Sequence, residues 1–177
     1  MINNFFSIPV HRSKVRSFDL IQDEVKRAMY IQKNNPDEIE FKGNIINECR
    51  LKGLKKEIYD HVDEYKNHIP FGKRSSKYFL GQGFSIKNSW ITRLVEGKSF
   101  GLHDHVMYDI SGCYYYSATA LKESLFFKVD GIWGGEHSIS PQQGEIILFP
   151  SFLKHGVKAN STKDVRVSLA FDILFNR

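Results

Sequence analysis

The segment GEIILFPSFLKH, residues 144–155, decides the fold prediction, because it combines a short apolar run, a turn and the start of a second extended segment. Apolar runs bounded by turn formers are typical of buried strands. Comparable β-rich runs fill the chain after Gly72, at residues 85–96, 103–106, 112–118, 125–129, 144–149, 155–157 and 165–174. Short strands in such close succession predict antiparallel sheets.

The chain before Gly72 has a different pattern. Apolar residues recur at helical spacing over residues 17–33 and 54–68, and residues 5–10 predict a short leading strand. Helices followed by a run of strands predict a mainly β protein with N-terminal helices, that is, a double-stranded β-helix (a cupin-like jelly roll) with helices packed on one sheet. We expect a single domain over residues 1–177, with the N-terminal strand and supporting helices in 1–72 and the β-helix core in 73–177.

Composition excludes several classes of protein. With 41% hydrophobic and 25% charged residues the chain is an ordinary globular one rather than a disordered one. The net charge of +5 comes with no recognisable nucleic-acid motif, so no nucleic-acid partner is expected. No run approaches a membrane span, no signal peptide is recognisable, and two cysteines make no disulfide framework. A cytoplasmic protein without a membrane partner is the expectation.

Three histidines predict a metal site. His103 and His105 are two residues apart on a predicted strand, so they would share one face while Asp104 points away. His155, on a neighbouring strand, would complete a facial site, and imidazole suits iron, zinc, copper and nickel alike. A bulge that brings in Asp104, or a loop that places Asp109 nearby, would instead supply a carboxylate as the second ligand.

The remaining histidines lack this context. His61 and His68 are seven residues apart on the second predicted helix, and we expect them at its solvated edge. His11 and His137 are not assigned a role.

Arg166 predicts an anion site beside the metal. It lies in the alternating apolar segment 165–171, and a buried arginine needs an anionic partner, because leaving it unpaired is costly. A carboxylate gripped by the guanidinium meets that need, and Ser168, on the same face, can donate to it. The alternative is an outward Arg166 that pairs with Asp164 or Asp172.

These residues resemble the iron(II)/2-oxoglutarate-dependent oxygenase superfamily. There a histidine, a ligand two residues on and a distant histidine bind iron, and an arginine in an R-x-S pattern binds the distal carboxylate of 2-oxoglutarate. The chain is similar in particular to a small bacterial and phage branch with prolyl-hydroxylase-like character, through its residues 5–10, 103–105, 111–116 and 144–155. The similarity extends over most of the chain from Trp90 onward.

The resemblance implies Fe(II) as cofactor, 2-oxoglutarate and O2 as cosubstrates and ascorbate as a further candidate. It also implies a bacterial cell or a phage-infected host. Prolyl-hydroxylase-like members have a tyrosine that helps to hold 2-oxoglutarate, and this role falls on Tyr115. Arg93, ten residues before His103, occupies a position where relatives often contact 2-oxoglutarate. The chain departs from the superfamily at His105, where a carboxylate is usual, which leaves the iron site one negative charge short.

The implied activity is that of a dioxygenase that hydroxylates a C–H bond of a peptide or small molecule and releases succinate and CO2. One alternative is a cupin-like three-histidine metalloprotein that uses no 2-oxoglutarate and has no need of Arg166 and Ser168. Another is a non-enzymatic jelly-roll binding protein, in which the three histidines would share no cavity. The sequence indicates neither the substrate nor the oligomeric state.

Overall fold

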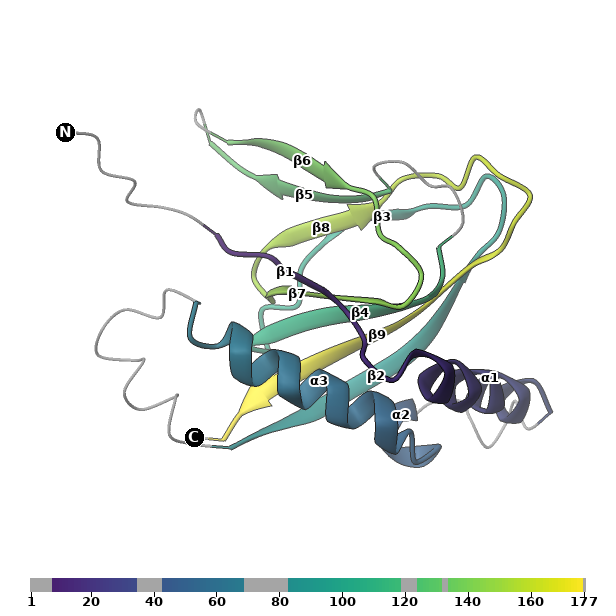
Figure 1. The fold of residues 1–177 in the computed structure, drawn as a ribbon. Coiled ribbons are helices and arrows are strands. Elements are labelled where there is room, and N and C mark those ends of the chain that lie inside the picture. Colours follow the sequence, from purple (N-terminus) through teal and green to yellow (C-terminus); the bar gives the residue numbers. More distant parts are fainter. Residues whose placement is uncertain (1–7, 35–42, 69–82, 119–123, 132–133, 177) are drawn as a thin grey trace.

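The computed structural model describes residues 8–34, 43–68, 83–118, 124–131 and 134–176 (Figure 1). The helices are α1 (Phe18–Asn34), α2 (Ile45–Glu48) and α3 (Lys52–Tyr65). The strands are β1 (His11–Lys14), β2 (Phe84–Leu94), β3 (Phe100–His103), β4 (Ile110–Ser117), β5 (Leu125–Val129), β6 (Gly135–Ile139), β7 (Glu145–Pro150), β8 (Lys154–Val157) and β9 (Arg166–Phe175).

The strands form two antiparallel sheets. The larger sheet has five strands in the order β1-β7-β4-β9-β2, and the smaller has four in the order β3-β8-β5-β6. Figure 1 shows the smaller sheet on one side of the larger sheet and the helices on the other. The predicted double-stranded β-helix with helices packed on one sheet is therefore confirmed.

Two apolar cores lie on the two faces of the larger sheet. One lies against the helices, where Ile21, Val25 and Ala28 of α1 are fully buried at helical spacing. The other lies between the sheets and contains Tyr115, Leu125, Phe127, Ile147, Phe149 and Leu153. Each fully buried apolar side chain of this size stabilises the fold by about 1.5–3 kcal/mol. The alternation of every strand therefore decides which side chains face the helices and which face the second sheet.

Gly112 allows side chains of the helix-facing core to pack directly against the backbone of β4. A Cβ atom at this position would lie 2.5 Å from the ring of Phe171 and 2.6 Å from Leu148. Both neighbours are fully buried in that core. A larger residue at position 112 would therefore push apart β4 and the strands on either side of it.

Most elements lie where the sequence predicts them, with four differences, one of which is the short helix α2, which the sequence pattern does not predict. The leading strand is His11–Lys14 rather than residues 5–10, of which 5–7 lie outside the described part of the chain. β3 ends at His103, so the predicted strand over 103–106 is wrong. β6 was not predicted, because Gly134-Gly135 indicates a turn. The division at residues 72 and 73 stays a prediction.

No helix in the described ranges has the length and apolar character needed to cross a membrane.

Candidate active site

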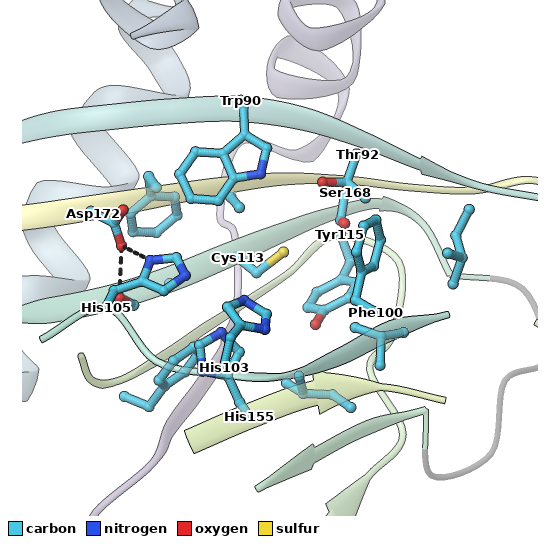
Figure 2. A pocket seen from close by; sticks show the side chains of 18 of the residues that line it. Trp90, Thr92, Phe100, His103, His105, Cys113, Tyr115, His155, Ser168 and Asp172 are labelled. Atoms are coloured by element: carbon cyan, nitrogen blue, oxygen red, sulfur yellow. Dashed lines mark hydrogen bonds and ion pairs between the residues drawn. The ribbon is translucent and has the colours of Figure 1, made fainter. Parts of the chain in front are cut away.

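The three predicted histidine ligands meet at one end of the space between the sheets (Figure 2). His103 and His155 are paired residues of β3 and β8, with ring centroids 4.4 Å apart. His105 follows in the loop after β3, with its ring centroid 5.2 Å from that of His103 and 5.3 Å from that of His155. The candidate ligand nitrogens of the three rings all lie within 4.8 Å of one another.

His105 reaches this group from a loop rather than from a strand. Its backbone N–H donates to the carbonyl of Ser151 over 2.8 Å, and its own carbonyl accepts from Tyr108 over 2.9 Å. The expectation that strand alternation alone joins His103 and His105 is therefore wrong in detail. The loop brings the two rings together, and it is held to the segment that precedes His155.

All three imidazoles are oriented by an acceptor at Nδ1. His103 Nδ1 donates to the carbonyl of Gly101 (2.8 Å), His155 Nδ1 to that of Leu153 (3.0 Å), and His105 Nδ1 to the carboxylate of Asp172 (2.8 Å). Because these oxygens can only accept, each Nδ1 carries a proton, and in the neutral ring Nε2 keeps its lone pair. Such partners are what fixes the tautomer of metal-ligating histidines.

Asp172 is the principal residue that the sequence analysis did not assign to this site. It is buried on β9, and its Oδ1 accepts both from His105 and from the hydroxyl of Ser111, 2.7 Å away. Ser111 in turn lies 2.9 Å from Ser151, so the carboxylate is held in a buried hydrogen-bond network. Asp172 thus places a negative charge next to Nδ1 of His105, on the side of the ring away from its candidate ligand atom Nε2.

Neither alternative carboxylate belongs to the histidine group. Asp109 uses Oδ2 to accept from the backbone N–H of Phe175. Asp104 is half-buried, and neither it nor Asp109 is in the group of ligand atoms that the three histidines form.

Burial keeps His155 neutral. Together with the smaller effect of the neighbouring His103 and His105, it lowers the pKa of His155 to about 4. For His105 the hydrogen bond that its Nδ1 donates to Asp172 has the opposite effect and raises the pKa. The geometry and the charges of the site therefore fit a divalent transition-metal ion on three Nε2 atoms.

Arg166 lies in the same pocket as the histidines. Its side chain is buried, its guanidinium lies 4.9 Å from the ring centroid of Tyr115, and its Nη1 donates to the hydroxyl of Ser124 over 3.4 Å. Among the described residues no carboxylate forms an ion pair with it. The alternative of an outward Arg166 paired with Asp164 or Asp172 is therefore wrong, because Arg166 points inward and Asp172 binds His105.

Two more predicted residues lie beside Arg166. Tyr115 and Ser168 are paired across β4 and β9, and both are buried between the sheets. The hydroxyl of Tyr115 has no hydrogen-bond partner among the described residues, and burial raises its pKa well above 10, so it stays protonated. A buried donor and a buried cation without an anion leave room for an acceptor with negative charge.

Arg93 is not part of this pocket. It is exposed on β2, whereas Trp90, Thr92 and Leu94 line the pocket, because alternate residues of a strand face opposite sides. The expected contact between Arg93 and 2-oxoglutarate is therefore not supported. The β2 residue beside Ser168 in the pocket is Thr92, which is paired with it across β2 and β9. Trp90 stacks on His105, with ring centroids 5.8 Å apart.

Comparison with known proteins matches part of the chain to a described family. The model of a family described as "Putative 2OG-Fe(II) oxygenase" matches residues 130–172, which include His155, Arg166, Ser168 and Asp172. No sequence among curated proteins matches the chain.

Solved structures share the fold at low identity. A Pseudomonas putida prolyl-4-hydroxylase is 16% identical, with a TM-score of 0.58 over 97% of this chain and 89% of that one. The α-ketoglutarate-dependent carbocyclase SnoK from nogalamycin biosynthesis is 10% identical, with a TM-score of 0.70 over 96% and 80%. HygX from Streptomyces hygroscopicus, solved with nickel and 2-oxoglutarate, is 10% identical, with a TM-score of 0.68 over 94% and 82%. The family model thus confirms the resemblance to the 2OG-Fe(II) oxygenases over residues 130–172, and the solved structures confirm the fold.

Proposed function

We propose that this protein is an Fe(II)- and 2-oxoglutarate-dependent dioxygenase that hydroxylates a C–H bond of a peptide or small molecule. One observation carries the proposal. A single pocket is lined by three histidines whose Nε2 atoms have no partner among the described residues and by a buried arginine that forms no ion pair with a described carboxylate. The first group fits a metal ion, and the second fits a carboxylate of a ligand that reaches toward it.

The residues then have distinct roles. His103, His105 and His155 hold the iron, and Arg166, Ser168 and Tyr115 bind the far carboxylate of 2-oxoglutarate. When bound, these two cofactors supply the oxidising chemistry, in which O2 and 2-oxoglutarate yield succinate, CO2 and one oxygen atom for the substrate C–H bond. Asp172 fixes the His105 ring and supplies the negative charge that a carboxylate ligand would otherwise bring.

The pocket walls exclude water from this chemistry. Phe149 packs 4.6 Å from His155 and 5.1 Å from Phe127, centroid to centroid, and both phenylalanines are buried. Trp90 covers His105 from the larger sheet. A dry pocket strengthens the attraction between Arg166 and a carboxylate, and it protects reactive species from side reactions.

The cupin-like alternative is favoured only by the all-histidine ligand set. It leaves Arg166 buried without an anion, which is the costly arrangement that the oxygenase proposal avoids. The non-enzymatic alternative required histidines without a shared cavity, whereas they lie together in one pocket.

The decisive experiment is anaerobic titration of the Fe(II)-loaded protein with 2-oxoglutarate, followed by the visible charge-transfer band of the chelate. We expect a band in the wild type and a weaker band in His105→Ala. In Arg166→Ala the band should not reach saturation at the 2-oxoglutarate concentrations that saturate the wild type. Arg93→Ala, exposed on the opposite face of the sheet, is the matched control and should titrate like the wild type. A protein that keeps its iron but gives no band would contradict the proposal and favour the cupin-like alternative.

A further inference from the structure

A second group of metal-ligating side chains lies where β1 meets α3. His11 of β1 and His61 and Glu64 of α3 place one candidate ligand atom each within 4.8 Å of one another. None of the three lines the active-site pocket. Position 64 follows position 61 by three residues, so both side chains lie on one flank of the helix.

His61 is buried with an unpartnered nitrogen. The residue is only 6% exposed, and its Nε2 has no hydrogen-bond partner among the described residues. The nearest group of opposite charge is Oε2 of Glu57, 3.6 Å away. Glu57 is held in place by the backbone N–H groups of Arg16 and Ser17 and by the Arg16 side chain. The expectation that His61 lies at the solvated edge of the helix is therefore wrong.

The position of Glu57 selects a tautomer of His61. A carboxylate only accepts hydrogen bonds, so the proton of neutral His61 is favoured on Nε2, where it faces Glu57. Nδ1 then keeps its lone pair, and it points at Nε2 of His11, 3.3 Å away. Glu57 would then accept the proton of His61 Nε2, as a carboxylate often does for a histidine whose other nitrogen binds zinc.

The spacing of the two rings fits a shared metal ion. Two nitrogens that bind one tetrahedral zinc ion at about 2.0–2.1 Å lie about 3.3–3.4 Å apart. His11 Nε2 and His61 Nδ1 already have this separation, and the Glu64 carboxylate is close enough to become a third ligand with a modest rotamer change. Burial also lowers the pKa of both histidines, which favours the neutral form that binds metals.

We infer that His11, His61 and Glu64 bind a divalent transition-metal ion of the zinc type, which joins β1 to α3. Two imidazoles and a carboxylate are a common donor set for such an ion, with water as the fourth ligand. The same junction is already joined next to His11, where the hydroxyl of Tyr65 donates to the carbonyl of Pro9 over 2.7 Å. The ion would thus link β1, an edge strand of the larger sheet, to α3.

The test is equilibrium dialysis of the untagged full chain against Zn²⁺, with bound zinc counted per chain. His103→Ala, an exposed ligand of the first site, serves as the background in which the first site is disabled. We expect this variant to retain one tightly bound ion. Adding His11→Gln or Glu64→Gln should weaken that binding at least about tenfold. The matched controls Asp63→Asn, an exposed neighbour on the same helix, and His137→Gln on β6 should change nothing.

Thermal unfolding gives an independent readout of the same site. Glu64 is exposed, so Glu64→Gln should fold normally, which far-ultraviolet circular dichroism can verify. Zn²⁺ should raise the unfolding temperature of the His103→Ala protein, and should raise it much less once Glu64→Gln is added. The inference is overturned if His103→Ala retains no zinc, or if neither His11→Gln nor Glu64→Gln changes the affinity with which it retains zinc. If Zn²⁺ does not change the unfolding temperature of the His103→Ala protein, the proposal that the ion joins β1 to α3 is overturned.

Discussion

Nδ1 of His105 and Oδ1 of Asp172 lie 2.8 Å apart, and this contact joins the loop after β3 to the central part of β9. The two residues are 67 positions apart in the chain. The contact sets the ring orientation of His105, and it places a buried negative charge next to a ligand set that consists of histidines alone.

Asp172→Asn should weaken metal binding while leaving the fold intact. The amide keeps the shape of the side chain but removes its charge, and changes of this kind behind a ligand cost about 10–100-fold in metal affinity. The measurement is the Fe(II) or Zn²⁺ dissociation constant under anaerobic conditions. Asp164→Asn, in the exposed loop before β9, is the control. Equal affinities for Asp172→Asn and the wild type would show that the contact does not support the metal.

His105→Asp should impair the site, although it restores the superfamily's usual ligand. The new carboxylate would face Asp172, and two close carboxylates cannot both stay ionised without cost. The double variant His105→Asp/Asp172→Asn removes that repulsion, and it should bind metal more tightly than His105→Asp alone. A double-mutant cycle of metal affinities measures the coupling, which we expect to be at least about 1 kcal/mol. Additive effects would contradict it.

Arg166→Met should separate stability from cosubstrate binding. Without a ligand the buried guanidinium contacts the Ser124 hydroxyl and the Tyr115 ring and forms no ion pair with the described residues, so an apolar side chain of similar length should raise the free energy of unfolding by about 1 kcal/mol. The same change should abolish saturation with 2-oxoglutarate. Urea unfolding of the cosubstrate-free protein measures the first effect. A loss of stability would indicate that the cation already has a strong partner.

Tyr114 should make the fold sensitive to alkaline pH. Burial raises its pKa to about 12, and its hydroxyl accepts from Gln22 of α1 over 2.9 Å. Because the folded protein favours the protonated phenol, the stabilisation is complete below pH of about 10 and is lost as the pH rises from about 10 to about 12. The loss amounts to about 3 kcal/mol. Unfolding of Tyr114→Phe, compared with the wild type across this range, should show a correspondingly flatter dependence on pH.

The sequence predicts the fold well because periodicity is a local property. β5 lies at residues 125–129 as predicted, and in α3, which falls in the predicted helical segment 54–68, Leu54, Ile58 and Val62 are buried at helical spacing. In each of these segments the residues that must be buried are themselves neighbours in sequence, so their spacing is sufficient.

The site is predicted only in part, because its details depend on contacts between distant segments. Asp172 is an even number of residues from Arg166 and Ser168 and therefore shares their face, but the sequence does not show that the loop after β3 reaches it. The register of β3 is irregular between Phe100 and His103, and the strand ends at His103, so His105 lies in the following loop. On β2, Trp90, Thr92 and Leu94 alternate with Ile91 and Arg93, and each of these two sets contains an apolar residue, so alternation near Arg93 does not by itself show which set faces the pocket.

The strand β9 supplies residues to both ends of the pocket, since Arg166, Ser168 and Asp172 all belong to its inner face. Six residue steps separate the arginine from the aspartate, which corresponds to about 20 Å of extended chain. Inserting or deleting one residue between them would turn one of the two toward the helices. Insertions and deletions that preserve both must therefore come in pairs, and each pair would alter the separation by about 6.6 Å. Point substitution is thus the evolutionary route open to this pocket, whereas changes of length belong in its loops.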